Sequence, residues 1–303
     1  MANTLTNLTE TILQDEILPA LKLGLVPLNA FSTRVGSDNA ITDNVILVPL
    51  AAAKTAGTYA GSWQSGDSTT TSASVTWEAP TFSAWYIDPA REAFPTVERW
   101  LSQGREAAYA VAQSVLQDVL ANFVAANIND VADTDKKVVT AANYEARDQA
   151  DLWSMLSTKG VGRATGAIHT IAYAAALFKD NVLLDKSASD SNVLQTGELP
   201  PILGVRQFFT DAFPAAVTNE NTGVIYTGPT TAAVALGVPN KIEEGLETAA
   251  GVQEMLVTDP DGTGLSLVWR QWVDSATGYY WGAIYISKGD NFVQNAAVRV
   301  TSA

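Results

Sequence analysis

The longest periodic pattern of apolar residues lies between residues 96 and 128, where no proline interrupts the chain. Its apolar stripe consists of Val97, Leu101, Gly104, Ala108, Val111, Val115 and Val119. Steps of three and four residues place these positions on one side of a helix. At 1.5 Å per residue the predicted helix is roughly 50 Å long, enough to cross a whole domain. Apolar residues spread around its C-terminal half, which predicts burial on more than one side.

Two shorter helices are predicted on either side of the long one. Residues 4–23 form an amphipathic pattern that Pro19 should kink or end. Its apolar face must find a partner, either within the same chain or on a neighbour. A second helix is predicted over residues 144–157, with Gly160 as a capping residue just beyond its end. The expected inner face of this second helix consists of Ala146, Ala150, Trp153 and Leu156.

Two strands separated by a long loop are predicted before the long helix. Residues 45–50 and 75–82 have strand composition, and apolar and polar residues alternate in the second stretch. The loop between them is rich in Gly, Ser and Thr, which is typical of a flexible tip. Together these stretches predict a projecting hairpin. Tyr59 and Trp63 near its tip suggest a docking surface, because exposed aromatic rings are costly in water.

The pattern changes after residue 163, where short strands and helices alternate. The predicted strands cover 165–169, part of 200–210, and 223–226, and the predicted helices cover 171–179 and 230–236. Such alternation indicates a mixed α/β domain with a central sheet. The end of the chain is predicted to be rich in strands, at 265–273, 279–286 and 296–300, with a turn at 274–278.

Composition narrows the class of protein. The chain has 303 residues, 47% hydrophobic and 17% charged, which is typical of a globular protein of one large or two modest domains. No apolar run is long enough to predict a membrane span. The N-terminus lacks the pattern of a signal peptide, so we expect the protein to stay in the cytoplasm unless an assembly carries it out. A net charge of −14 gives no global attraction for nucleic acid, so any contact with DNA requires a small basic patch or simple enclosure.

Metal and cofactor motifs are weak. The chain has no cysteine and one histidine, which excludes thiolate and multi-histidine sites. The glycine-rich run at 160–166 has the wrong spacing and the wrong flanking elements for a dinucleotide, and we interpret it as a turn. Asp259 and Asp261 begin a calcium-loop pattern, but Arg270 stands where a bidentate Glu is required. The carboxylates of Asp130, Asp133 and Asp135 are interpreted as solvated loop acids.

Catalytic chemistry is also unsupported by the sequence. His169 has no neighbouring nucleophile motif, so we interpret it as a structural histidine. Lys54 in the predicted loop is interpreted as a solvated lysine, although it could donate an isopeptide bond to a neighbouring subunit. We therefore predict no catalytic, cofactor-binding or metal-binding residues, no cofactor, and no enzymatic activity.

The order of these elements resembles that of the tailed-phage major capsid proteins, which have the Hong Kong 97-type coat fold. Four phrases carry the resemblance: ILQDEILPALKLGLVPLNAFST, AIHTIAYAAALFKDN, LPPILGVRQFFTDAFP and GVIYTGPTTAAVAL. They resemble the N-terminal arm, a strand followed by a helix, the next strand, and a later strand followed by a helix. The likeness extends over essentially the whole chain.

The resemblance implies an α+β fold with four parts. These are an N-terminal arm (1–44), an extended two-stranded loop (45–88), a peripheral domain with a spine helix (89–162, plus part of 256–290), and a mixed α/β axial domain (163–255, plus part of 291–303). It further implies self-assembly through pentamers and hexamers into an icosahedral shell around double-stranded phage DNA. The implied partners are other copies, portal, scaffolding and decoration proteins, and DNA held without sequence-specific contact, with no membrane. The expected location is the virion capsid, and the host cytoplasm during assembly.

Three alternatives stay open at the level of sequence. An encapsulin-type shell that stores cargo enzymes shares the expected architecture. A soluble α/β enzyme that uses carboxylates would need a perturbed acid pair in a deep pocket. A tail or head-accessory protein of a phage is the third alternative, and a lack of shell formation would favour it.

Overall fold

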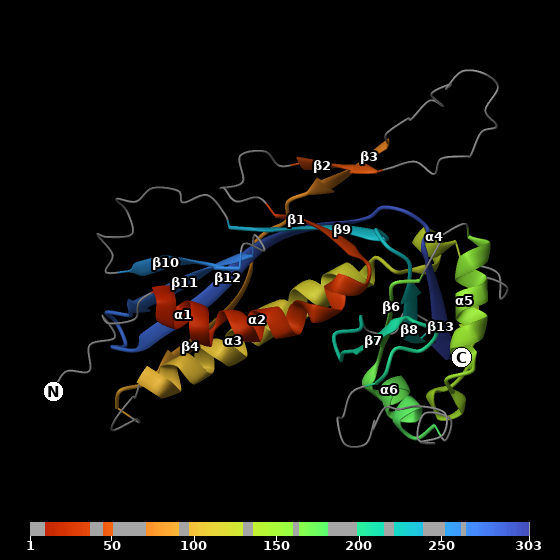
Figure 1. The fold of residues 1–303 in the computed structure, drawn as a ribbon. Coiled ribbons are helices and arrows are strands. Elements are labelled where there is room, and N and C mark those ends of the chain that lie inside the picture. Colours follow the sequence, from red (N-terminus) through yellow and green to blue (C-terminus); the bar gives the residue numbers. More distant parts are fainter. Residues whose placement is uncertain are drawn as a thin grey trace.

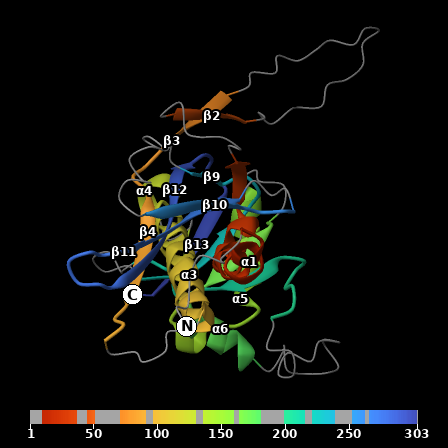
Figure 2. The same ribbon diagram turned by 90° about the vertical axis from the view of Figure 1, so that its left-hand side faces the viewer.

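The computed structural model describes residues 10–36, 45–50, 71–90, 97–129, 136–159, 164–180, 199–214, 221–238, 252–261 and 265–302. Within these ranges the chain is a mixed α+β protein with an elongated body (Figure 1). One end of the body holds a six-stranded sheet, and the other end holds a five-stranded sheet. A two-stranded hairpin stands outside the body in both ribbon views (Figures 1 and 2). No helix among the described residues is long and apolar enough to cross a membrane.

The N-terminal helical segment is divided at Ile17 into α1 (Glu10–Glu16) and α2 (Leu18–Leu25). Pro19 lies in the first turn of α2, where its missing N–H costs no helical hydrogen bond. The predicted kink is therefore confirmed. A 3₁₀ turn, η2 (Val26–Ala30), continues the segment. The buried side chains of α1, the junction and α2 include Leu13, Ile17, Leu18, Leu21 and Leu25, and α2 packs along the long helix α3.

Helix α3 (Val97–Ala121) is the longest element, with 25 residues and a length of about 37 Å. The predicted single helix over 96–128 is wrong at its end, because the chain leaves the helix after Ala121 and forms the short α4 (Ala125–Ile128). The break turns Phe123 inward, where its ring meets the edges of Phe31 and Phe292 at 5.1 and 5.7 Å. The N–H groups of Asn122 and Phe123 still donate to the carbonyls of Val119 and Leu120, and the aromatic contact buries the Phe123 ring.

The six-stranded sheet is built around the 13-residue strand β12 (Tyr280–Phe292). The other five strands are β1 (Ser32–Gly36), β4 (Thr81–Ile87), β9 (Ala232–Gly237), β10 (Gln253–Thr258) and β11 (Ser266–Val273). The first half of β12 pairs with β4 and β11, and its second half pairs with β9. Helices α1, α2 and α3 cover one face of this sheet, and the main core lies between the helices and the sheet.

The five-stranded sheet has the order β5-β13-β8-β6-β7. Its strands are β5 (Lys136–Val138), β6 (Gly166–His169), β7 (Arg206–Phe209), β8 (Asn221–Thr227) and β13 (Ala297–Ser302). A second core joins it to α5 (Asp148–Thr158) and α6 (Ile171–Phe178), with the 3₁₀ turn η3 (Ala141–Asn143) nearby. The sequence predicted β6, α6, β7, β8 and β13, and the turn at 274–278 is confirmed, with Gly278 at φ +73°.

Three expectations are wrong in local detail. The predicted helix at 230–236 is strand β9, because pairing with β1 and β12 buries all six of its residues and removes any alternation. The predicted strand at 75–82 is the end of β3 (Thr71–Thr76) and the start of β4, separated by a segment that contains Pro80. The sequence also gave no prediction for β1, β5 or β10.

The inner face of α5 is the third error. Trp153 is 47% exposed and Ala150 is exposed, whereas Leu152 and Leu156 are buried. The helix begins only at Asp148. Its buried residues Gln149 and Leu152 each lie one position before the expected Ala150 and Trp153, and only Leu156 coincides. Ala146 is buried, but it precedes the helix.

Candidate functional site

The β2–β3 hairpin is the first surface feature of functional interest. β2 (Val45–Leu50) pairs antiparallel with β3, from Val45 opposite Thr76 to Leu50 opposite Thr71. The hairpin is present as predicted, but its second strand is 71–76 instead of the predicted 75–82. Residues 51–70 connect its two strands outside the described part of the chain. Val75 in β3 is fully buried against Ala233 and Ala235 of β9. The hairpin is therefore attached to the body through β3.

A buried lysine lies where the hairpin meets the body. The side chain of Lys288 in β12 is only 3% exposed, and its Nζ pairs with the carboxylates of Glu78, Asp118 and Asp290. The Nζ–oxygen distances are 3.3 Å to Asp118 and 3.2 Å to Asp290. Burial lowers the pKa of Lys288, but the three carboxylates outweigh that effect and the net shift is upward. The lysine therefore stays charged.

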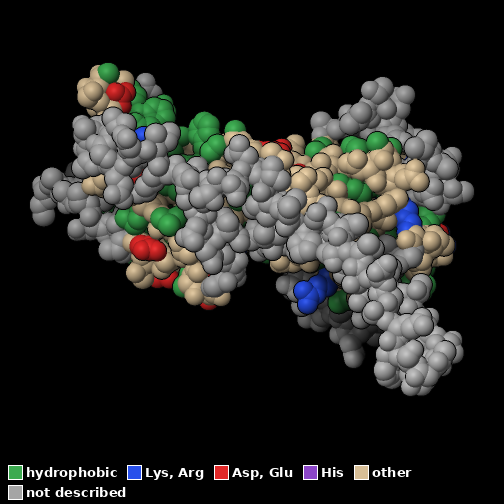
Figure 3. All heavy atoms as spheres, turned by 90° about the horizontal axis from the view of Figure 1, so that it is seen from above, with side chains coloured by type: hydrophobic (Ala, Val, Ile, Leu, Met, Phe, Trp, Pro, Cys, Tyr) green, Lys and Arg blue, Asp and Glu red, His purple; other side chains and the backbone are tan. Residues whose placement is uncertain are grey.

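The outer face of the six-stranded sheet, opposite the helices, is rich in aromatic side chains. Residues that alternate with the buried ones point this way, and Phe82 and Tyr86 of β4 are 69% and 51% exposed. Seen from above, hydrophobic side chains gather at the surface over the end of the molecule that carries this sheet (Figure 3). Exposed apolar patches of this kind mark contact surfaces.

Ring stacking orders this face. Tyr86 stacks on Tyr279 at 5.2 Å, and Trp281 stacks on Trp272 at 5.8 Å, with Tyr86 and Trp281 in contact at 5.0 Å. A hollow of about 440 Å³ lies beside these rings. It is lined by Pro80, Phe82, Ala84, Val252, Arg270, Trp272, Ala283 and Tyr285. Small alanines between large aromatic walls give the face a shape that another apolar surface could fill.

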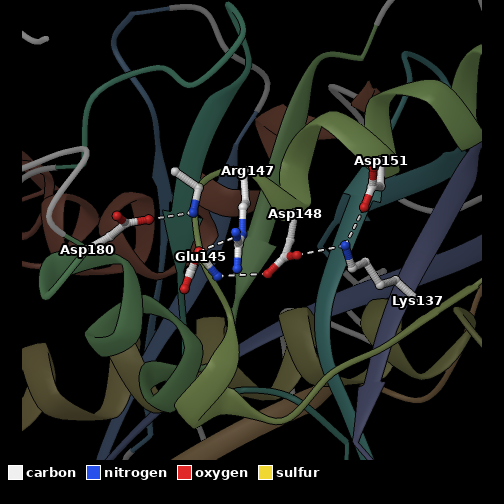
Figure 4. Close-up of polar contacts among 7 residues, drawn as sticks. Lys137, Glu145, Arg147, Asp148, Asp151 and Asp180 are labelled. Carbon is white, nitrogen blue, oxygen red and sulfur yellow. Dashed lines mark hydrogen bonds and ion pairs between the residues drawn. The ribbon is translucent and has the colours of Figure 1, made fainter.

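A polar cluster secures the start of α5 (Figure 4). Lys137 of β5 pairs with Asp148 at 2.6 Å and also with Asp151. Asp148 accepts a hydrogen bond from the backbone N–H of Glu145 at 2.8 Å, and Asp180 accepts one from the N–H of Ala146 at 2.6 Å. Burial lowers the pKa of Lys137, but the hydrogen bonds that its ammonium donates to Asp148 and Asp151 raise the pKa overall. These carboxylates satisfy backbone donors and one cation, which is a structural role.

His169 is fully buried at the end of β6, as a structural histidine would be. Its Nε2 lies 2.7 Å from Oε1 of Gln207, and Gln207 in turn exchanges hydrogen bonds with Gln149. The ring also lies 5.9 Å from that of Tyr144. Burial lowers the pKa of His169 to about 4 despite the Gln207 contact. A histidine with this pKa is neutral near pH 7, which suits a structural role in the core.

Asp259 and Asp261 are both engaged in ion pairs within the chain. Both bind Lys22 of α2, at 2.8 and 2.9 Å, and Asp259 also accepts the N–H of Asp261. The cluster ties the end of β10 to α2, and the predicted Asp turn is confirmed. Among the described residues, no group of three or more acidic or histidine side chains is arranged to hold a metal ion.

Several residues singled out from the sequence lie outside the described residues. They are Lys54, Tyr59, Trp63, Asp130, Asp133, Asp135 and Gly160. Two features of the structure were not predicted from the sequence, the Lys288 cluster and the aromatic sheet face. The second left a signal in Phe82, Trp85 and Tyr86, since apolar residues on both phases of a strand indicate that both of its faces are apolar.

Comparison with known proteins gives a result only at the level of structure. No protein-family model matches the chain, and no curated protein matches it in sequence. The capsid of Ralstonia phage GP4 matches with a TM-score of 0.55 and 10% identity, over 90% of this chain and 87% of the other. The capsid structure of the cyanophage P-SCSP1u matches with a TM-score of 0.53 and 11% identity, over 91% and 87%.

A third structure, from Gordonia phage Cozz, has a TM-score of 0.51 and 17% identity, over 92% of this chain and 86% of the other. In each case the likeness spans nearly the whole of both chains, so it concerns the complete arrangement of helices and sheets. The chain therefore has the α+β fold of phage capsid structures.

Proposed function

We propose that this chain is the major capsid protein of a tailed phage, with the Hong Kong 97-type fold. Its copies assemble through pentamers and hexamers into an icosahedral shell that encloses double-stranded DNA. The observation that carries the proposal is the fold shared with phage capsid structures over about nine-tenths of the chain. The sequence resemblance, found along the whole chain, supports the same role.

The elements fit the parts that this role requires. In the proposed division, α1 and α2 belong to the N-terminal arm (1–44) and the β2–β3 hairpin to the extended loop (45–88). Helix α3 is then the spine of the peripheral domain (89–162), to which β11 and part of β10 and β12 add. The five-stranded sheet and α6 belong to the axial domain (163–255 and part of 291–303). Strand β9 joins the two domains, because it pairs with β12.

The surfaces suit ring formation. A ring closes when one patch on a subunit meets a different patch on the next copy. The projecting hairpin and the aromatic face around Phe82 and Tyr86 are two such patches, and the exposed rings gain free energy when a neighbour covers them. The role is mechanical and uses no catalytic residue.

Further partners belong to the same proposal. We expect portal and scaffolding proteins and decoration proteins to contact the shell, and DNA to be enclosed without sequence-specific contacts. The protein would then reside in the virion, and in the host cytoplasm during assembly.

Electron microscopy of the purified chain, paired with light scattering, tests the proposal. We expect capsomer rings or closed shells, alone or after co-expression with a scaffolding protein. The nucleic-acid content of the shells would distinguish a virion from an enzyme-storing compartment. A homogeneous small monomer or dimer under both conditions would refute the proposed function.

A further inference from the structure

The β2–β3 hairpin joins the body through a short segment, from Ser74 to Glu78. Two backbone groups of this segment are bound by β12. The side-chain amide of Asn291 donates to the carbonyl of Ser74 at 2.7 Å, and the N–H of Glu78 donates to the carbonyl of Lys288 at 2.8 Å. The direction of the whole hairpin therefore depends on how firmly this segment holds β12.

One side of the contact is a close backbone approach at Gly289. A Cβ atom at this position would lie 2.6 Å from the carbonyl oxygen of Thr76 and 3.0 Å from Val75. Side chains of successive residues in a strand point to opposite faces. The hairpin therefore rests on the face of β12 to which Gly289 belongs, while Lys288 and Asp290 point to the other face.

The other side of the contact is the Lys288 cluster. Glu78 approaches Lys288 from the hairpin segment, Asp118 from α3, and Asp290 from β12 itself. Asp290 is 5% exposed and also accepts a hydrogen bond from Asn122, which follows α3. One buried cation thus connects the hairpin, the long helix and the central strand.

Contacts on a single face of a strand would leave the hairpin free to rock about its line of contact. The Glu78–Lys288 pair lies on the second face and opposes that motion. Because Lys288 is buried, removing a partner leaves charge that water cannot fully solvate, so the arrangement that keeps the carboxylates around its Nζ is favoured.

We infer that Lys288 is a positioning residue that fixes the angle of the β2–β3 hairpin relative to α3 and the six-stranded sheet. The hairpin segment packs against Gly289 on one face of β12. On the other face, its Glu78 pairs with Lys288. This inference concerns the single chain and does not depend on whether the chain forms a shell.

The absence of cysteine from the chain makes a direct test practical. Spin labels at Ser74→Cys in β3 and Ala110→Cys in α3, both exposed positions, report the distance between hairpin and helix by pulsed electron paramagnetic resonance. Labelled chains are diluted into an excess of unlabelled chain, so that distances between copies do not contribute.

The distance distribution is compared in four backgrounds. We expect one narrow distribution in the unmodified background and in Lys22→Met, a control that removes a different two-carboxylate ion pair at the end of β10. We expect Lys288→Met and Glu78→Gln to lose the single narrow distribution and to populate new distances. Glu78 is about half exposed, so Glu78→Gln should fold and melt normally even if Lys288→Met does not fold.

A broad distribution in the unmodified background would overturn the inference. An unchanged narrow distribution in Glu78→Gln, or in a folded Lys288→Met, would overturn it equally. None of these readouts involves assembly, so failure of the proposed capsid function would leave this test intact.

Discussion

Acid should destabilise the fold through His169, the single histidine of the chain. Its Nε2 is paired with Gln207, and its Nδ1 is buried with no hydrogen-bond partner among the described residues. Protonation would place a new N–H donor, and a charge, in a core formed by Tyr144, Gln149 and Gln207. The folded pKa is lowered from 6.5 to about 4, so the unfolded chain binds the proton more tightly.

The magnitude follows from this difference in pKa. The contribution to stability is complete above pH 6.5, falls as the pH drops from 6.5 to 4, and then stays constant because both states are protonated. At 1.36 kcal/mol per pKa unit, the full loss is about 3 kcal/mol, and about 2 kcal/mol is lost by pH 5. Such a loss is a substantial part of the stability of a typical domain.

Urea denaturation followed by tryptophan fluorescence, at a series of pH values between 7 and 4.5, measures this effect. The control is His169→Gln, which cannot titrate and has a polar side chain that can still face Gln207. Carboxylates titrate in both proteins, so the difference between the two pH profiles isolates the histidine. Parallel profiles for the original protein and His169→Gln would refute the reasoning, whatever their absolute stabilities.

Three further predictions concern assembly and packing. Phe82→Ser should leave the melting temperature nearly unchanged but reduce the yield of shells in electron microscopy, whereas Val138→Ser, at a similarly exposed position in β5, should reduce it less. Gly104→Ala should lower the free energy of unfolding by about 1–3 kcal/mol, because the new Cβ would lie 2.7 Å from the Trp269 ring. An unchanged urea midpoint would contradict that packing. Lys159→Met should cost about 1–3 kcal/mol in the same assay, because Lys159 donates to the carbonyls of Ile128 and Ala297 at 2.8 and 2.9 Å. A midpoint equal to that of the unmodified chain would show that water replaces the lysine without loss.

The helices and the hairpin could be predicted because their signals are local. Apolar spacing placed α3, and Pro19 marked the kink between α1 and α2. β9 was mistaken for a helix because a strand buried on both faces has no alternation, and its alanines also favour a helix. The end of α3 was misplaced because Phe123 leaves the helix to meet Phe31 and Phe292, which are far away in the sequence.

The candidate site was less accessible from the sequence for the same physical reason. The Lys288–Glu78 pair joins residues 210 positions apart, and no spacing rule reports such a pair. Phe82 is exposed because the helices cover the opposite face of β4. Which face they cover depends on how α3 packs against the sheet. A sequence pattern gives the two faces of a strand but does not say which face is covered.

The internal pairing of cations leads to a last prediction, on DNA. Lys288 and Arg299 are almost completely buried, Lys137 is largely buried, and each contacts groups of its own chain. These three cations are therefore not available to neutralise phosphates, and the net charge of −14 opposes association with DNA. We expect purified protein to bind linear double-stranded DNA weakly at physiological salt, with little change when the salt is lowered.

Fluorescence anisotropy with a labelled duplex measures this binding, and a DNA-binding protein with an exposed basic patch serves as the positive control. Tight binding that weakens steeply with added salt would show a basic surface that the described residues do not account for. It would contradict the proposal that a shell of this protein encloses DNA without holding it, whereas weak binding would agree with that proposal.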